Sequence, residues 1–308
     1  MLPCRARDQS PLGLACGFKV CSYNVAMPEL PEVETVVRGL RPFLSDRTIA
    51  EVIVHWPGSI RTPEPELFVT RLTGRTVVDV DRRGKWILID LDDGQTLLVH
   101  LRMTGQLLLE ASDTPQDDYT RVVFCLDDDG RGRVERLRFS DMRKFGRLVL
   151  TDEPRDVLAE LGPEPLSDAF TVRRFKRMLA ERRGRIKPLL LNQRFLVGLG
   201  NIYADEALWR ANIHPLRAAN SLSFKEVRDL YKAIRSVLRE AIGEGGTTLR
   251  NGNYRRASGQ EGEFACRLAV YDREGDLCEC CGCPIERIEV GQRGTYYCPD
   301  CQPQDVVD

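Results

Sequence analysis

Four hydrophobic residues between positions 31 and 44 are spaced at helical intervals. They are Val33, Val37, Leu40 and Leu44. Positions three, four and seven apart share one face of an α-helix, so residues 31–44 are predicted to form an amphipathic helix. Pro31 suits its first turn, because the amide that proline lacks has no helical partner there.

From residue 49 to residue 150 the apolar residues come in short runs instead. Clusters of Gly, Asp and Pro separate these runs, at intervals typical of the strands of a sandwich or barrel. The sequence TDEPRDVLAELGPEPLSD (151–168) follows as a Pro-rich, acidic connector. These patterns predict a β-rich first domain with one leading helix.

Helical patterns dominate after the connector. They cover residues 169–191, 202–213 and 223–242, and short strand-like segments surround the cysteine pairs that follow. The predicted fold class is therefore α+β with two domains. An N-terminal β-sandwich with a leading helix precedes a C-terminal helical domain that carries a small metal-binding ribbon.

Composition and charge agree with a folded, globular chain. Its 308 residues, 42% hydrophobic and 30% charged, suffice for two cores. No apolar run approaches the roughly 18 residues that span a bilayer, so we expect no membrane partner. The net charge of -1 does not indicate a nucleic-acid partner, but residues 171–187 hold eight basic residues against one acidic residue. A local basic stripe of this kind is compatible with binding nucleic acid.

The first 26 residues have no sustained helical or strand period. The stretch PLGLACGF resembles the core of a secretion signal ending at Cys16, but it is short and Gly13 stands where a leucine-like residue is expected. We interpret residues 1–27 as a disordered extension or the product of a mis-assigned start, with Met27 as the initiator.

Six of the eleven cysteines lie within the last 31 residues. Cys278 and Cys281 form one C-x2-C pair, and Cys298 and Cys301 form another after 16 intervening residues. This spacing is typical of a zinc ribbon in a reducing cytoplasm. Four thiolates leave no open position on the metal, so one structural Zn2+ is predicted as the cofactor.

The choice of ligands is not unique. Cys280 and Cys283 also form a C-x2-C pair. We favour Cys278 and Cys281, because Gly282 then follows the second ligand, as it does in many zinc knuckles.

Several sequence strings resemble the formamidopyrimidine-DNA glycosylases. They are MPELPEVET (27–35), LGPEPLSD (161–168), GLGNIYADEALWRANIHP (198–215), GGTTLR (245–250) and QRGTYYC (292–298). Their order and spacing, with the cysteine pairs, make the resemblance specific from Met27 to the last pair. The sister endonuclease VIII branch usually has Gly where this chain has Leu30, which favours the branch that repairs purine lesions.

The resemblance implies a bifunctional repair enzyme that excises oxidised purines, namely 8-oxoguanine and formamidopyrimidines, from duplex DNA and cuts the abasic strand by β,δ-elimination. Pro28 is then the nucleophile, once Met27 is removed. A free α-amine has a pKa near 8, against about 10.4 for lysine, so more of it is neutral at pH 7. Its attack on the deoxyribose C1′ gives an iminium, or Schiff-base, intermediate.

The same resemblance assigns roles to charged residues. Glu29 is expected to donate and shuttle protons, and Glu32 to orient the first helical turn. Lys85 and Arg293 are expected to hold phosphates beside the extruded nucleotide; the planar guanidinium of Arg293 suits bidentate contacts.

Further residues are expected to contact DNA. Met103, Arg143 and Phe145 match the trio that fills the hole left by the extruded base. Asn201 matches the contact made by the helix–two-turns–helix element, and its neighbouring glycine amides can receive a phosphate. Arg182 and Lys187 would neutralise neighbouring phosphates.

The predicted organisation has six parts. They are the extension 1–27, a catalytic β-sandwich 28–150, a linker 151–168, a helical DNA-binding domain 169–263, a zinc knuckle 264–303 and a tail 304–308. We expect a cytoplasmic monomer that binds damaged double-stranded DNA and needs no nucleotide cofactor.

Two departures from the family pattern concern lesion recognition. A DNA-contacting histidine is expected before the strand RVVFCL, where this chain has QDDYT (116–120). The loop that should cover the flipped base, residues 250–264, is diverged and arginine-rich. Two alternatives stay open: an endonuclease VIII-like enzyme for oxidised pyrimidines, and a non-catalytic damage-binding protein if Met27 and the extension are retained.

Overall fold

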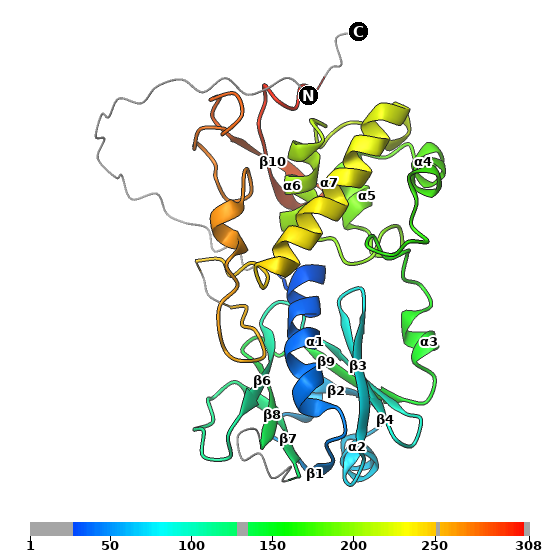
Figure 1. Ribbon diagram of the computed structural model, residues 1–308, viewed down its shortest axis with the longest axis vertical. Helices are drawn as coiled ribbons and strands as arrows, with labels where there is room; N and C mark the ends of the chain where they lie inside the picture. Colours follow the sequence, from blue (N-terminus) through cyan, green and yellow to red (C-terminus); the bar gives the residue numbers. More distant parts are fainter. Residues whose placement is uncertain (1–26, 128–134, 251–252, 305–308) are drawn as a thin grey trace, which may run out of the picture.

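The computed structural model describes residues 27–127, 135–250 and 253–304. A β-rich lobe and a helical lobe lie end to end, and helix α1 (Leu30–Leu44) begins at the helical lobe and runs into the β-rich lobe (Figure 1). The predicted α+β class with a leading helix is confirmed. The interpretation of residues 1–26 as an extension lies outside the described residues.

Helix α1 follows the predicted amphipathic pattern. Val33, Val37, Leu40 and Leu44 are all buried. Its first turn is closed by the backbone amide of Glu29, which donates to Glu32 Oε2 at 2.8 Å. Two buried carboxylates therefore lie at the end of α1 that meets the helical lobe.

The β-rich lobe is a sandwich of two sheets. One has the order β1 (Ile49–Val54), β7 (Thr120–Leu126), β8 (Arg136–Asp141) and β6 (Gly105–Glu110). The other has the order β2 (Ile60–Thr62), β9 (Arg147–Thr151), β5 (Thr96–His100), β4 (Trp86–Leu91) and β3 (Val77–Arg83). All neighbours are antiparallel except β2 and β9. The short elements η1 (Pro57–Ser59) and α2 (Pro65–Leu72) complete this lobe.

Helix α3 (Pro154–Leu158) lies in the connector, beside the β-rich lobe (Figure 1). Among the described residues the helical lobe itself contains four α-helices. They are α4 (Val172–Ala180), α5 (Ile186–Leu191), α6 (Asn201–Arg210) and α7 (Phe224–Gly243). Two short 3-10 helices accompany them: η2 (Ala219–Ser221) lies between α6 and α7, and η3 (Phe264–Arg267) follows α7. A hairpin of β10 (Glu286–Val290) and β11 (Arg293–Tyr297) ends the lobe.

The helix expected over 169–191 is broken into α4 and α5. Between them the chain pairs with a distant segment: Gly184 O accepts from Ala219 N at 2.9 Å, and Arg182 O accepts from Asn220 N at 3.0 Å. A continuous helix would also lack the bond to Gly184 O, because Pro188 has no amide hydrogen to donate. The apolar period alone did not reveal this break.

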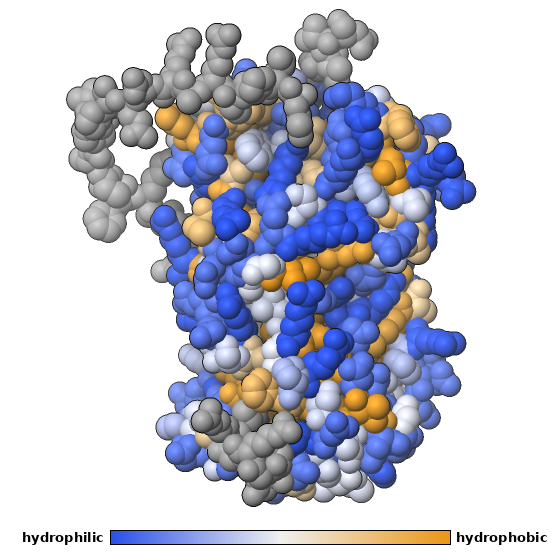
Figure 2. Space-filling view, viewed as in Figure 1, coloured by the Kyte–Doolittle hydropathy of each residue, from blue (hydrophilic) through white to orange (hydrophobic). Residues whose placement is uncertain are grey.

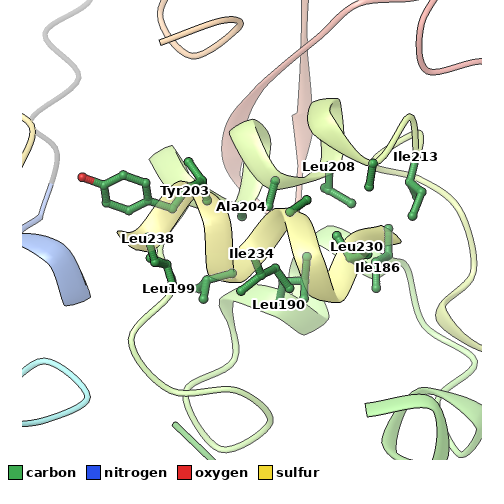
Figure 3. Close-up of a cluster of buried hydrophobic side chains, with 14 of the residues drawn as sticks. Ile186, Leu190, Leu199, Tyr203, Ala204, Leu208, Ile213, Leu230, Ile234 and Leu238 are labelled. Atoms are coloured by element: carbon green, nitrogen blue, oxygen red, sulfur yellow. The ribbon is translucent and has the colours of Figure 1, made fainter. Parts of the chain in front are cut away.

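Helices α6 and α7 form the centre of the helical core. Leu199, Leu208, Leu230, Ile234 and Leu238 pack together there and are fully buried (Figure 3). Ser223 caps α7, accepting from Glu226 N while Glu226 Oε2 accepts from Ser223 N at 2.7 Å. Within the described parts of the chain, no helix combines the length and apolar character that crossing a membrane requires.

Truncating the centre of this core should destabilise the protein. Leu238 is 0% exposed, so Leu238→Ala removes apolar contacts and leaves a cavity, at a cost of about 2–5 kcal/mol in the free energy of unfolding. Urea denaturation measures the change. Leu67→Ala is the matched control, since Leu67 is 42% exposed and should change stability little; equal effects would contradict this packing.

Candidate functional site

A cavity of about 310 Å³ opens where the two lobes meet. Five of the residues singled out in the sequence line it: Glu29, Lys85, Met103, Asn201 and Arg293. They come from the residue before α1, two loops and the first residues of α6 and β11. The fold therefore brings together residues that are up to 264 positions apart.

Glu29 is the buried carboxylate of this cavity. Its oxygens accept from Gly200 N at 2.6 Å and Ile202 N at 2.9 Å, at the amino end of α6. Burial raises its pKa to about 7, although Lys85 and these amides act in the opposite direction. A Cβ on Gly200 would clash with the Glu29 carboxyl group, so the close approach requires glycine.

Glu32 lies behind Glu29 and joins three segments. Tyr203 Oη donates to it at 2.5 Å, Thr247 N at 2.8 Å and Glu29 N at 2.8 Å. The Tyr203 ring belongs to the helical core, and its hydroxyl points out of that cluster (Figure 3). Burial raises the pKa of Glu32, and the Tyr203 hydrogen bond opposes the shift. This geometry suits a residue that positions α1.

Pro28 is buried immediately before Glu29, and Met27 lines the cavity. With Met27 attached, the Pro28 nitrogen is part of a peptide bond. Its lone pair is then delocalised and not nucleophilic.

Lys85 follows the tight turn between β3 and β4 and is 7% exposed. Gly84 has φ +60°, and a Cβ there would clash with the Val197 side chain. Glu164 holds this turn, accepting from Gly84 N at 2.6 Å, Arg82 at 2.9 Å and Arg83 at 3.0 Å. Burial lowers the pKa of Lys85, and the Glu29 charge opposes that change. The LGPEP string thus fixes the lysine of the other lobe.

Arg293 lies at the exposed start of β11, facing the cavity. The adjacent Gly294 O accepts from Asn201 Nδ2 at 2.9 Å and from Lys187 Nζ at 3.1 Å. Asp205 accepts from Tyr296 N at 2.9 Å. These contacts connect the hairpin to the helical lobe.

Lys187 corrects one expectation. Its side chain is 0% exposed, and Nζ contacts Asp205 Oδ1 at 2.7 Å, Thr295 Oγ1 at 2.7 Å and Gly294 O. The ammonium group pairs with Asp205 and donates hydrogen bonds to Thr295 and Gly294. The side chain has no solvent exposure, so the residue holds the hairpin from inside and does not face a phosphate on the surface.

Four thiols cluster at the base of this hairpin: Cys278, Cys281, Cys298 and Cys301. Cys278 Sγ and Cys301 Sγ are 3.8 Å apart, and Cys281 Sγ and Cys298 Sγ are 3.3 Å apart. Tetrahedral zinc with bonds of about 2.3 Å needs thiolates about 3.8 Å apart. The cluster fits one structural zinc ion with no open position.

The predicted void-filling residues divide between two loops. Met103 lines the cavity, whereas Arg143 and Phe145 are exposed in the β8–β9 loop. The Arg143 guanidinium carbon lies 4.9 Å from the Phe145 ring centroid. Lys144 Nζ lies 3.9 Å from the Trp56 ring centroid.

Buried Asp141, the last residue of β8, fixes the β8–β9 loop by accepting hydrogen bonds from its backbone. It accepts from Gly146 N at 2.7 Å and Arg143 N at 3.2 Å. The exposed pair Arg143 and Phe145 is therefore carried on an ordered turn.

Arg182 does not join the cavity. It is exposed between α4 and α5, beside a separate recess of about 190 Å³ that Arg174 and Arg194 also line. Hydrophilic residues cover most of the molecular face seen in Figure 2, so an exposed arginine alone does not mark a site.

Among the cavity residues that the sequence interpretation missed are His100 and Arg102. His100 Nδ1 accepts from Arg102 N at 3.0 Å. Burial lowers the pKa of His100 to about 3, so it is neutral at pH 7. Both belong to the string HLRMTG, whose resemblance to the family drew attention to Met103 alone.

Asp117 of the QDDYT segment has a structural role. It pairs with Arg138 of β8 at 2.6 Å and accepts from Tyr119 N at 2.9 Å. These contacts connect the segment before β7 to β8, and neither acid of the segment lines the cavity.

Comparisons with known proteins agree with this geometry. Three family models match: the formamidopyrimidine-DNA glycosylase N-terminal domain at 27–148, its H2TH domain at 161–252 and the zinc finger found in FPG and IleRS at 275–304. A formamidopyrimidine-DNA glycosylase of Herpetosiphon aurantiacus is 51% identical over 90% of this chain and 100% of its own length.

Solved structures lead to the same family. The MutM (FPG) protein of Thermus thermophilus is 44% identical with a TM-score of 0.80, covering 91% of this chain and 100% of its own. A Lactococcus lactis FPG mutant, in complex with Fapy-dG-containing DNA, is 35% identical with a TM-score of 0.82 and covers 90% and 100%. The chain thus belongs to the formamidopyrimidine-DNA glycosylase family.

Proposed function

We propose that this protein excises oxidised purines, 8-oxoguanine and formamidopyrimidines, from duplex DNA and then cuts the abasic strand by β,δ-elimination. The observation that carries the proposal is Glu29, a buried carboxyl with a pKa of about 7 beside Pro28 at a cation-rimmed cavity. Relatives that carry the glycosylase name over nearly the whole chain support it.

The reaction needs the damaged nucleotide outside the helix, because the attacked C1′ atom is shielded within stacked DNA. Lys85 lines the cavity from the β-rich lobe and Arg293 lines it from the helical lobe. Both would hold the phosphates beside the extruded nucleotide. Arg102 also lines the cavity and adds a third cation. Met103, Arg143 and Phe145 would occupy the space that the extruded base leaves.

Pro28 supplies the nucleophile once Met27 has been removed. Its neutral amine forms a bond to C1′ while the bond from C1′ to the base breaks and the base takes the electron pair. A proton from Glu29 neutralises the leaving base or the sugar oxygen. The amine then loses its proton, the sugar ring opens and the iminium forms. Glu29 subsequently accepts and returns protons during the two eliminations.

The proposed chemistry also bears on the location, oligomeric state and cofactor needs of the protein. Reduced thiolates are needed at the zinc site, which supports a cytoplasmic location. A single chain supplies Glu29, Lys85 and Arg293 to one cavity and places Pro28 next to Glu29, so a monomer suffices, and the proposed steps need no nucleotide cofactor. The relatives' names do not favour the oxidised-pyrimidine alternative, although one Lactococcus lactis structure contains an oxidised pyrimidine in DNA.

Whether Pro28 is the first residue should decide whether the protein forms a covalent adduct with DNA. Protein beginning at Pro28 should be trapped on lesion-containing DNA by borohydride, which reduces the iminium to a stable amine. Full-length protein should give no adduct, since its Pro28 nitrogen is an amide. Gel analysis of mass-verified samples measures the adduct.

Pro28→Gly in the trimmed protein keeps a terminal amine and should retain some trapping. Efficient trapping by the full-length chain would show that another amine attacks, with Lys85 the first to test. If intact-mass measurement shows that protein from its native host keeps Met27 and the extension, the protein is instead the non-catalytic binding protein.

Removing the proton donor, Glu29, should separate base excision from covalent attack on an abasic site. In Glu29→Gln, base excision should fall about 10²–10⁴-fold, whereas trapping on a preformed abasic site should persist, because no base has to leave. In the trimmed enzyme that keeps Glu29, the excision rate should decline as pH rises above 7, since Glu29 with a pKa of about 7 then loses its proton. Glu66→Gln, an exposed change in α2, is the control; an equal loss of both activities in Glu29→Gln would contradict the assigned role.

Salt dependence should report the phosphate contact of Arg293. For duplex DNA, each neutralised phosphate contributes about 0.9 to the slope of log affinity against log salt. Arg293→Ala should flatten the slope by about that amount, as measured by fluorescence anisotropy. Arg228→Ala removes the same charge from α7, away from the cavity, and should leave the slope unchanged; identical slopes for all three proteins would remove Arg293 from the interface.

A further inference from the structure

The zinc region contains a second group of potential metal ligands. Cys281 Sγ, Cys283 Sγ and a carboxylate oxygen of Asp300 lie within 4.8 Å of one another. This triad shares Cys281 with the zinc tetrad. The ECCGC sequence therefore supplies one thiol beyond those that the structural zinc needs.

The shared ligand is the accessible corner of the tetrad. Cys278 and Cys298 are buried and Cys301 is half-buried, whereas Cys281 is exposed. Asp300 is also exposed, and Cys283 is half-buried. A second cation can thus approach the solvent side of the Cys281 sulfur without disturbing the inner ligands.

The backbone fixes Cys283 beside the tetrad. Its carbonyl accepts from Cys278 N at 2.8 Å, and Gly282 N donates to Cys278 O at 2.9 Å. Gly282 has φ +79°, a conformation that favours glycine. The tight turn that places Cys281 on the zinc therefore also holds Cys283 two residues further on.

Charge favours a second cation at this place. Four thiolates and one Zn2+ carry a net charge of about -2, and the exposed Asp300 carboxylate lies next to them. Two thiolates and one carboxylate, with water in the fourth position, suit a borderline or soft divalent ion such as Zn2+ or Cd2+; Mg2+ and Ca2+ prefer oxygen ligands.

We propose that Cys281, Cys283 and Asp300 bind a second thiophilic divalent cation, which the Cys281 thiolate bridges to the structural zinc. This site has three protein ligands and an open position, so it binds metal more weakly than the closed tetrad. It connects the two chain segments that flank the β10–β11 hairpin. The proposal does not depend on the repair activity.

Cadmium exchanged into the full-length protein under a phosphine reductant tests the site. After removal of free metal, the unmodified protein should hold two cadmium ions per chain. Its 113Cd NMR spectrum should contain two resonances that split each other through the shared sulfur. Cys283→Ser should hold one cadmium ion and give one unsplit resonance, and Asp300→Asn should bind the second ion more weakly.

Cys280→Ser is the matched control, since it removes an exposed thiol outside the triad and should keep both resonances. All variants keep the tetrad, so one retained metal per chain verifies that the ribbon is folded. A single cadmium ion in the unmodified protein would overturn the proposal. So would two resonances that persist in Cys283→Ser, or a Cys281–Cys283 disulfide in place of metal binding under the same reductant.

Discussion

The amino end of α1 is fixed to the helical lobe by two buried carboxylates. Glu29 accepts the first free amides of α6, and Glu32 binds Tyr203 and Thr247. Leu30 N adds a bond to Gly198 O at 3.0 Å. The residue proposed to attack DNA is therefore positioned by the same contacts that join the lobes, and a shift between the lobes would move nucleophile and acid together.

A second buried group determines the other wall of the cavity. Lys187 and Asp205 form an ion pair with no solvent exposure, and removing one partner of such a pair costs about 3–5 kcal/mol because a charge is left buried. Both partners also bind the backbone of β11, and the zinc ribbon holds the base of the hairpin. Arg293 owes its position to these interactions, since its own side chain is exposed.

Local sequence patterns predicted the features that depend on nearby residues. The apolar period of α1, the strand runs of the sandwich and the two cysteine pairs each need only a few neighbouring positions. The patterns failed where a distant partner decides the outcome. The predicted helix breaks between α4 and α5, where Ala219 and Asn220 donate to the carbonyls of Gly184 and Arg182. In the sequence Lys187 is one of several neighbouring cations, and its burial depends on distant partners, Asp205 and the backbone of β11.

The pKa of Glu29 reflects opposing effects that removal of Met27 would alter. Burial raises it, while Lys85 and two backbone amides lower it. A free Pro28 would place a second titratable group beside it, with an ordinary pKa near 8. Two interacting groups of similar pKa titrate as a pair, so a single proton would be shared between amine and carboxyl. The reactive form has the proton on Glu29 and a neutral Pro28, and transfer of that proton to the amine would disable both groups at once. The same residue, Met27, also occupies the edge of the cavity, so its loss would create the nucleophile, open space for the nucleotide and establish this proton equilibrium.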